Sequence, residues 1–218
     1  MAKIESYVRP QWLYRYRSLE HFERELEAIE QSYLYCAAFH QLNDPMEGTF
    51  TSSRLLKKSE EYRAIRNAVI DNKARIGMCS FSEVHDNELM WAHYADHFKG
   101  ICVAYRFALL RKSLGDDVRF VRMYYNETEP MIRSAATEPE RLAKMVLSYK
   151  YYRWLYEREW RMFASLGKAC YHKVECVARV YLGSRIDPTY KKRIRRRLKP
   201  LGIKTKDMTI EEYFISFE

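Results

Sequence analysis

The run GICVAYRF, residues 100–107, is the feature that most constrains the fold, because it has the composition and length of a short buried strand. Two further runs, RIGMCSFSE at 75–83 and CVARVYLG at 176–183, are also short and rich in β-favouring residues. Each is separated from the next by segments with helical or turn character. Strands interspersed with helices in this way predict an α+β fold.

Apolar residues recur at helical spacing in the segment SLEHFERELEAIEQ, residues 18–31. Its stripe contains Leu19, Phe22, Leu26 and Ile29, and Ser18 is placed to cap the first turn. Further helices are predicted at 54–74, at 86–98 with Asp86 or Asn87 as cap, at 138–154, and in the basic segment near 190–199.

The remaining strands are predicted at 12–17, 32–39, 117–126, 157–165 and 210–217. The chain contains no internal repeat and no linker-like segment. We therefore expect residues 1–218 to form a single α+β domain with mixed, mostly antiparallel sheets and flanking helices. The motif-bearing core spans about 12–185, and a basic helix and a closing strand follow within 186–218.

The composition favours a globular protein of a reducing compartment. Hydrophobic residues make up 47% of the 218 residues and charged residues 31%. The five cysteines are odd in number and form no C-x-x-C pair, which argues against a disulfide framework or a zinc cage. The sequence shows no signal peptide and no apolar run near 18 residues. A cytoplasmic location without membrane association is the expectation.

The net charge of +9 is concentrated in one element. The segment KKRIRRRLK, residues 191–199, contains seven cations and no anion, so it accounts for seven of the nine net positive charges. On a helix, Ile194, Leu198 and Leu201 would share the face that docks on the core. Two interpretations of the cations stay open: a contact for nucleic acid or an acidic protein, and a solvated face. The first would use Arg195, Arg196 and Arg197.

Glu157 and Glu159 stand one residue apart in the segment YEREWRMF, residues 156–163. On a strand their carboxylates would lie side by side and suit catalysis, one stabilising a cationic transition state and the other orienting or deprotonating an attacking group. On a helix Glu157 would instead pair with Arg161. A surface ladder of salt bridges is the alternative explanation for the strand arrangement.

Other polar side chains are candidates for ligand contact. Arg15 on the first strand could grip an anion through its guanidinium fork, although an edge strand with solvated cations would look the same. Ser80 and Ser82 share one strand face and could bond a ribose or an amide. The turn-rich segment NDPMEG, residues 43–48, presents Asn43, Asp44 and Glu47, of which turn chemistry alone explains the first two.

The predicted helix ELMWAHYADHF, residues 88–98, carries His93 and His97 four residues apart, a spacing used by zinc ligands. The residue after His93 is tyrosine, not the glutamate of H-E-x-x-H, so no metal site is expected. Trp91, His93 and Tyr94 are better candidates for stacking on, or hydrogen bonding to, a ligand beside the serines. A packed amphipathic helix would have the same pattern.

Several motifs in their order resemble a widespread bacterial family catalogued as a domain of unknown function. They are LYRYRS, FHQLNDPMEG, CSFSE, LMWAHYADHFKGICVAY and WLYEREWR, and the family shares N-D-P-x-E, M-W-x-H-Y-A and W-x-Y-E-x-E-W/Y-R blocks. The resemblance extends over about residues 12–185. It implies no activity by itself.

The order of elements also resembles, more remotely, the ADP-ribosyltransferase superfamily, which implies a split β-sandwich fold and NAD as a substrate. In that superfamily a first strand carries Arg or His, a middle strand Ser, Thr or Tyr, and a late strand Glu, often as E-x-E. Carried across, Arg15 would grip NAD, and Ser80 or Ser82 would contact the nicotinamide-side ribose. Tyr94 or Trp91 would stack on the nicotinamide.

The resemblance also implies roles for the two glutamates. Glu159 would bond the ribose 2′-hydroxyl and stabilise an oxocarbenium-like transition state, and Glu157 would orient the acceptor nucleophile. The chain has no clear S-T-S tripeptide, no first-strand histidine, and no assignable counterpart in that superfamily for the N-D-P-x-E loop.

Three functions follow as hypotheses. The first is an NAD-consuming ADP-ribosyltransferase acting on nucleic acid or protein, a role that would suit a toxin or phage-defence effector with a neutralising partner protein. The second is a non-catalytic nucleic-acid-binding module that uses the basic helix and the tyrosines. The third is a metal-dependent nuclease, which would use Asp44, Glu47, Glu157 and Glu159.

Overall fold

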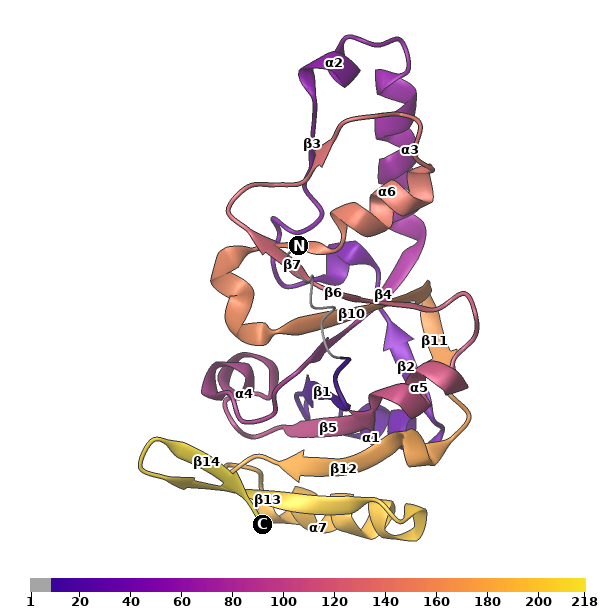
Figure 1. The fold of residues 1–218 in the computed structure, drawn as a ribbon. Helices are drawn as coiled ribbons and strands as arrows, with labels where there is room; N and C mark the ends of the chain where they lie inside the picture. Colours follow the sequence, from indigo (N-terminus) through magenta and orange to yellow (C-terminus); the bar gives the residue numbers. More distant parts are fainter. Residues whose placement is uncertain (1–8) are drawn as a thin grey trace, which may run out of the picture.

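A computed structural model describes residues 9–218, so the first eight residues of the expected domain lie outside the described part of the chain. Its main element is an eight-stranded sheet in the order β14-β13-β12-β5-β1-β4-β10-β6 (Figure 1). The strands are β1 (Trp12–Arg17), β4 (Ile76–Ser82), β5 (Ile101–Arg106), β6 (Arg119–Arg122), β10 (Glu159–Ser165), β12 (Val177–Leu182), β13 (Lys204–Glu211) and β14 (Phe214–Phe217).

Three two-stranded sheets complete the β-structure. They pair β2 (Tyr33–Cys36) with β11 (Gly167–Cys170), β3 (Thr51–Ser52) with β8 (Met131–Ile132), and β7 (Tyr124–Asn126) with β9 (Tyr149–Tyr151). Only the β12–β13, β3–β8 and β7–β9 pairs are parallel among the named strands. The expected α+β fold with mostly antiparallel sheets is confirmed.

The large sheet is weakly joined in its middle. β1 pairs with β5 along its whole length and β4 with β10 along its whole length, but β1 meets β4 at the single position Tyr14↔Ser82. Since strands that share one paired position do not run side by side, β4 and β10 diverge from β1 and β5 (Figure 1). The side chains at this division are free to line a cavity.

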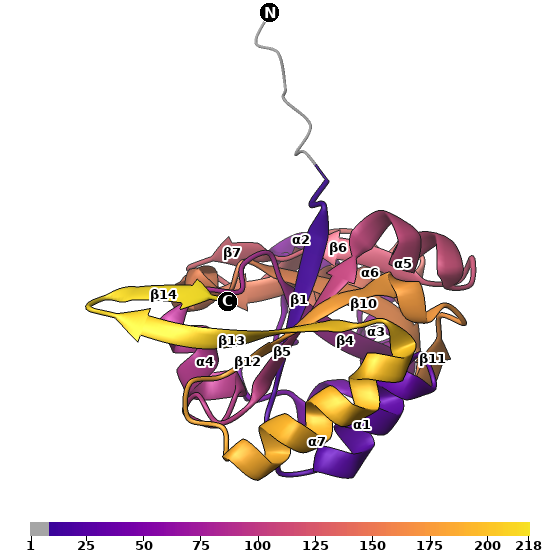
Figure 2. The ribbon, with the colours of Figure 1, turned by 90° about the horizontal axis from the view of Figure 1, so that it is seen from below.

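Helices cover both parts of the sheet. They are α1 (Phe22–Glu30), α2 (Arg54–Lys57), α3 (Tyr62–Arg75), α4 (Glu88–Tyr94), α5 (Phe107–Ser113), α6 (Pro139–Val146) and α7 (Pro188–Leu198), with short 3-10 turns at η1 (Phe39–Gln41), η2 (Tyr152–Glu157), η3 (Val174–Cys176) and η4 (Lys199–Leu201). Figure 2 shows α1 and α7 side by side. Among the described helices, none combines the length and the hydrophobicity of a membrane span.

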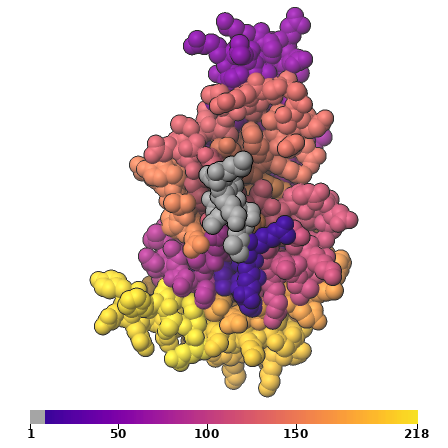
Figure 3. Space-filling model, viewed as in Figure 1, coloured from indigo at the N-terminus to yellow at the C-terminus, as the bar shows by residue number. Residues whose placement is uncertain are grey.

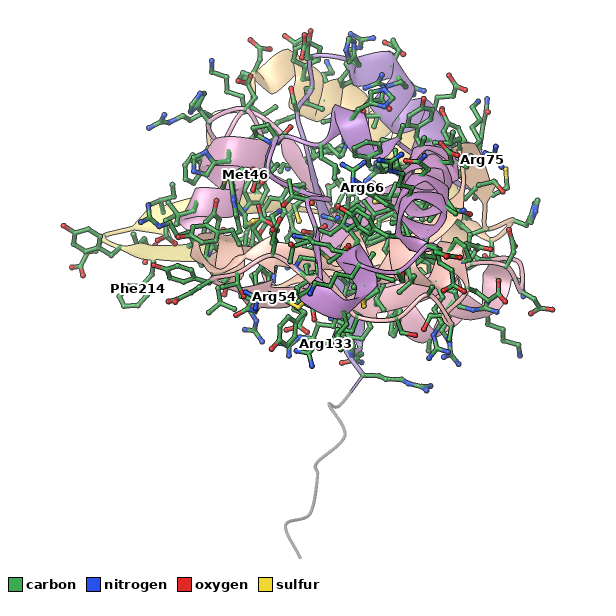
Figure 4. All side chains as sticks on the ribbon, turned by 90° about the horizontal axis from the view of Figure 1, so that it is seen from above. Met46, Arg54, Arg66, Arg75, Arg133 and Phe214 are labelled. Atoms are coloured by element: carbon green, nitrogen blue, oxygen red, sulfur yellow. The ribbon has the colours of Figure 1, made fainter. Side chains whose placement is uncertain are left out.

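The packing follows the sheet division. The largest core joins Leu13 and Val180 of the sheet to Leu26 of α1 and Ile194 of α7. A second core packs α3 and α6 on the β4 and β10 side, and a third packs α4 on β5. Two extensions leave this body: the α2 region projects at the top of Figure 3, and the β13–β14 hairpin ends near Phe214 in Figure 4.

Several elements differ from the sequence expectations. The helix predicted at 54–74 is divided into α2 and α3, and the strand predicted at 117–126 is divided into β6 and β7, which belong to different sheets. The helix predicted at 138–154 ends at Val146, because residues 149–151 pair with β7, a long-range contact that the local pattern does not show. The closing strand predicted at 210–217 is a hairpin, since Glu212 has φ 54° and reverses the chain. The helix predicted at 86–98 ends at Tyr94, since Asp96, His97 and Phe98 all have positive φ.

Capping was predicted correctly at one helix and wrongly at another. The Asn87 side chain accepts a hydrogen bond from the Met90 N–H at 3.0 Å and so caps α4. Ser18 does not cap α1, which begins at Phe22; its hydroxyl accepts from the Glu20 N–H at 3.0 Å in the preceding turn.

Candidate functional site

A cavity of about 620 Å³ lies at the division of the large sheet. Its lining comes from α1, β1, β2, β4, β10, α4, η2 and the loop before β3. Nine of the residues singled out from the sequence are among the lining residues: Arg15, Asn43, Asp44, Glu47, Ser80, Ser82, Tyr94, Glu157 and Glu159. The fold therefore brings together candidates that lie as far apart in the chain as β1 and β10.

A buried charge cluster forms one wall of this cavity. Lys150 contacts three carboxylates, with its Nζ 2.5 Å from Glu157 Oε2, 3.1 Å from Glu159 Oε2 and 3.2 Å from Glu47 Oε1. Arg161 contacts Glu47 Oε2 at 2.6 Å and Glu159 Oε1 at 2.8 Å. All five side chains are buried, with at most 6% of their surface exposed.

Lys150 was not among the residues singled out from the sequence, and Arg161 was expected only as a possible salt-bridge partner. A usable signal was present, because Glu157, Glu159 and Arg161 alternate within an aromatic segment that has to be buried. Charges at alternate positions of a buried segment require partners in the interior. The identity of Lys150 as the main partner depends on a long-range contact.

Glu159 is an ionised carboxylate held in place. Arg161 donates to Oε1 through Nε at 2.9 Å, and its Nη1 donates to the Leu147 carbonyl at 2.7 Å. Burial raises the pKa of Glu159, but the charges of Arg161 and Lys150 outweigh burial and lower that pKa to about 2. Glu159 therefore presents a fixed negative charge at physiological pH.

Glu157 is in a different protonation environment. Burial is the largest cause that raises its pKa, Lys150 opposes the shift, and the neighbouring charge of Glu159 adds to it. The Tyr94 hydroxyl donates to Glu157 Oε1, and Lys150 donates to Oε2. A carboxyl whose pKa is moved toward neutrality can exchange a proton during a reaction.

The two glutamates do not share a strand, contrary to the expectation. Glu157 ends η2, Arg158 adopts a left-handed conformation with φ 46°, and Glu159 begins β10. The carboxylates still converge, because both bind Lys150. The turn has no glycine to mark it, so the sequence pattern did not reveal it.

Arg15 is a half-buried cation without a fixed partner. Its neighbour Arg17 donates to both oxygens of Glu25, at 2.7 and 2.5 Å. The Arg15 guanidinium, by contrast, makes no hydrogen bond or ion pair within residues 9–218, although it lines the cavity and feels the charge of Glu25. It is therefore available to bind an anionic group.

The two serines have different roles in the structure. Ser82 is buried, donates its hydroxyl hydrogen to the Glu157 carbonyl at 2.7 Å and accepts from the Val84 N–H at 3.1 Å. It holds η2 against β4. Ser80 is exposed toward the cavity, and its hydroxyl bonds to Glu159 and helps to lower that pKa. Ser80 is thus better placed than Ser82 to contact a ligand.

Trp91 and His93 lie outside the cavity lining. Trp91 is fully buried, donates its indole N–H to the His85 carbonyl at 2.7 Å and packs edge-on against Tyr16. His93 is exposed on α4 beside Tyr156. Of the three aromatic candidates on this helix, the structure places Tyr94 alone at the cavity.

The basic helix α7 docks as its sequence pattern predicted, with Ile194 and Leu198 buried. Two of its candidate arginines are engaged within the chain: Arg195 pairs with Asp207, and Arg197 binds Glu30 at 2.5 Å and Glu23 at 2.6 Å. Arg196 is exposed. None of the three lines the cavity, so a nucleic-acid contact here would be separate from it.

The acidic residues of the nuclease hypothesis are arranged around cations. Glu47, Glu157 and Glu159 are bridged by Lys150 and Arg161, and Asp44 lines the same cavity. Within residues 9–218, no group of three or more His, Cys, Asp or Glu side chains could hold a metal ion. The carboxylates of this group are thus neutralised by cations of the chain itself.

Residues 90–162 match the family model described as Protein of unknown function (DUF2971). This third of the chain extends from the middle of α4 into β10, and it contains Tyr94, Lys150, Glu157, Glu159 and Arg161. The match supports the expected relation to a domain-of-unknown-function family. No curated protein matches the chain, and no solved structure matches it.

Proposed function

We propose that this protein is an NAD-consuming enzyme of the ADP-ribosyltransferase type. The observation that carries the proposal is that Arg15, Ser80 and Glu159 line one cavity from the three neighbouring strands β1, β4 and β10. The resemblance had assigned NAD binding, ribose contact and catalysis to three strands far apart in sequence. The order of these strands in the sheet is the one that a shared site requires.

The sheet division supports the same proposal at the level of fold. A split β-sandwich is a sheet system that opens near its middle, and β1 and β4 meet here at one position only. The cavity at that opening, about 620 Å³, lies within the range of small-molecule sites.

The site residues suggest a division of labour on NAD. Arg15 would bind the pyrophosphate, because a guanidinium without a partner suits a phosphate oxygen pair. Ser80 would contact the nicotinamide-side ribose. Tyr94, whose hydroxyl is engaged by Glu157, would offer its ring face to the nicotinamide.

In the proposed reaction the bond between nicotinamide and ribose C1′ breaks, and nicotinamide leaves with the bonding electrons. Positive charge develops on the ribose, and the fixed negative charge of Glu159 would stabilise it. The nucleophile of the acceptor then bonds to C1′, and its proton passes to Glu157. For the acceptor we propose a nucleic acid or protein. If it is acidic, the exposed cations Lys192 and Arg196 of α7 and Lys199 of η4 offer a secondary contact.

The direct test is NAD binding measured by calorimetry, with nicotinamide release followed in the same sample. We expect binding in the micromolar to millimolar range that enzyme substrates show, together with release. An absence of binding at millimolar NAD would refute the proposal.

Replacing Arg15 with glutamine should weaken NAD binding about 10- to 100-fold, because a charge-assisted hydrogen bond to phosphate is lost. Calorimetry measures the effect. The matched control is Arg63→Gln, an exposed arginine of α3 outside the cavity, which should bind NAD like the wild type. Equal affinities for the two variants would remove Arg15 from the binding site.

The pH dependence of the transfer rate should follow the protonation of Glu157. A base must be deprotonated, and burial moves the pKa of Glu157 above its ordinary value of 4.5. The transfer rate should therefore fall on the acid side of a midpoint that lies above 4.5, and Glu157→Gln should remove this limb. A profile that keeps the same acid limb in the variant would assign the proton transfer to another group.

A further inference from the structure

A second cavity, of about 410 Å³, borders the first across the buried charge cluster. It is formed by the loop from Asp44 to Thr49, the turn from Asn126 to Pro130, and the segment from Tyr149 to Arg153. Asp44, Glu47 and Lys150 line both cavities. The proposed NAD chemistry assigns no ligand to this second space.

Asp44 has an unsatisfied carboxylate oxygen. The residue is 8% exposed, and its Oδ1 accepts a hydrogen bond from the Met46 N–H at 2.9 Å. Its Oδ2 is buried and has no hydrogen-bond partner among residues 9–218. Because buried carboxylate oxygens are normally paired, a donor from outside the described chain would complete this site.

The charge balance of the second cavity favours a cation. Glu127 and Glu129 are exposed at its turn and make no ion pair within residues 9–218. Of the two cations in the lining, Lys150 is already held by three carboxylates. The other is Arg153, which is exposed. An anionic ligand would face this uncompensated negative charge.

The aromatic lining also suits a cation. Tyr149 and Tyr151 belong to the wall, and the Arg153 guanidinium carbon lies 5.8 Å from the centroid of the Tyr151 ring. This contact shows that the ring face already receives a cation of the chain itself. Met46, labelled in Figure 4, is an exposed apolar side chain of the same lining.

We infer that this second cavity binds an organic cation with N–H donors, that is, an alkylammonium or guanidinium group. Asp44 Oδ2 accepts the buried hydrogen bond, Glu127 and Glu129 attract the charge, and the tyrosine rings contact it. The inference does not depend on NAD turnover. The cation can belong to a free polyamine or to a basic side chain of a protein, and the chemistry of recognition is the same.

Calorimetric titration of the full chain with agmatine tests the inference, and N-butylurea serves as a neutral probe of similar shape. We expect agmatine to bind, N-butylurea to bind at least about tenfold more weakly, and agmatine affinity to fall with added salt. A titration with blocked arginine amide distinguishes a protein side chain from a free polyamine as the natural ligand. A site for a side chain should bind blocked arginine amide as tightly as agmatine. A site for free amines does not.

Three variants locate the site. Asp44→Asn and the double variant Glu127→Gln/Glu129→Gln should each weaken agmatine binding about tenfold or more. Arg153→Gln should strengthen it, because a competing cation leaves the Tyr151 ring. The double variant Glu60→Gln/Glu61→Gln changes two exposed glutamates elsewhere and should bind like the wild type.

If Asp44→Asn does not fold, the double variant Glu127→Gln/Glu129→Gln still tests the inference, because both of its glutamates are exposed. No agmatine binding to the wild type at 10 mM, about the weakest binding that such a titration detects, would overturn the inference. Equal binding of agmatine and N-butylurea, or equal affinity in the two glutamine double variants, would also overturn it. Each of these results is independent of whether the chain cleaves NAD.

Discussion

Replacing Glu159 with glutamine should abolish nicotinamide release from NAD, with a loss of at least about 100-fold in kcat. The lost group is the fixed negative charge that faces the developing positive charge of the ribose. Glutamine has the same shape but no charge, so the variant tests charge and not space. NAD binding should be less affected than turnover, because Arg15 supplies the ionic contact to the pyrophosphate.

The matched control for this prediction is Glu83→Gln. Glu83 is also a glutamate held by cations, since it pairs with Arg122 and Arg158 at 3.0 Å each, and its side chain is 14% exposed. It accepts from the Trp160 indole N–H at 2.7 Å, next to Glu159 in the chain, but it does not line the cavity. Turnover by Glu83→Gln should stay near that of the wild type.

A loss of activity in Glu159→Gln has to be separated from a loss of folding, because this glutamate also neutralises Arg161 and Lys150. The separation comes from NAD affinity and the unfolding transition measured on the same sample. A folded variant that binds NAD and does not release nicotinamide supports the proposed role. An unchanged rate of release would exclude Glu159 from the mechanism.

The strands that are mostly buried were the most predictable part of the fold. β4, β5 and β12 are short runs of β-favouring residues, and their burial follows from composition alone. The segment 149–157 was predicted poorly because its structure depends on distant partners. β9 pairs with β7, and η2 is held by the Ser82 hydroxyl, neither of which a local window contains.

The candidate site also has a part that the sequence predicts and a part that depends on long-range contacts. The types of residue at the cavity could be chosen from the sequence, since Arg15, Ser80 and Glu159 stood out by motif and strand face. Their arrangement could not, because it depends on which strands become neighbours in the sheet. Ser82 differs from Ser80 in role because its hydroxyl is engaged by the Glu157 carbonyl and the Val84 N–H, two contacts that the strand pattern does not reveal.

The N-D-P-x-E loop shows how a motif with no expected counterpart obtains a structural role. Glu47 reaches into the cluster and binds both Arg161 and Lys150, so the loop is tied to β10 and β9. Three carboxylates share two cations in this cluster. Burial raises the pKa of Glu157 and the neighbouring charge of Glu159 adds to it, whereas Arg161 and Lys150 together outweigh burial and lower the pKa of Glu159.

Replacing Arg161 with methionine should lower the free energy of unfolding by about 3–5 kcal/mol, because removal of one partner leaves buried carboxylates uncompensated. Arg161 is 1% exposed and binds Glu47, Glu159 and the Leu147 carbonyl, so all three lose a donor at once. Arg161→Lys should fall between the wild type and this variant, since it keeps the charge but cannot donate to all three acceptors. Chemical denaturation at pH 7 measures the free energy of unfolding of the wild type, Arg161→Met and Arg161→Lys.

The control is Arg158→Met, the same substitution at an arginine that is 52% exposed and pairs with Glu83 at the surface. It should change the free energy of unfolding by no more than about 1 kcal/mol. Similar losses in Arg158→Met and Arg161→Met would show that burial of the cluster does not govern its contribution.

The difference in unfolding free energy between the wild type and Arg161→Met should depend on pH, and the direction of this dependence can be predicted. The pKa of Glu159 is lowered in the folded wild type, so its contribution to stability is present above the ordinary value of 4.5 and is lost as pH falls toward about 2. Without Arg161 that pKa should rise, and Glu159 then accepts a proton at a higher pH. The difference in unfolding free energy between wild type and Arg161→Met should therefore shrink between pH 7 and pH 4, as denaturation at both values would show. A difference that stays constant would mean that the loss comes from packing and not from the uncompensated charge of Glu159.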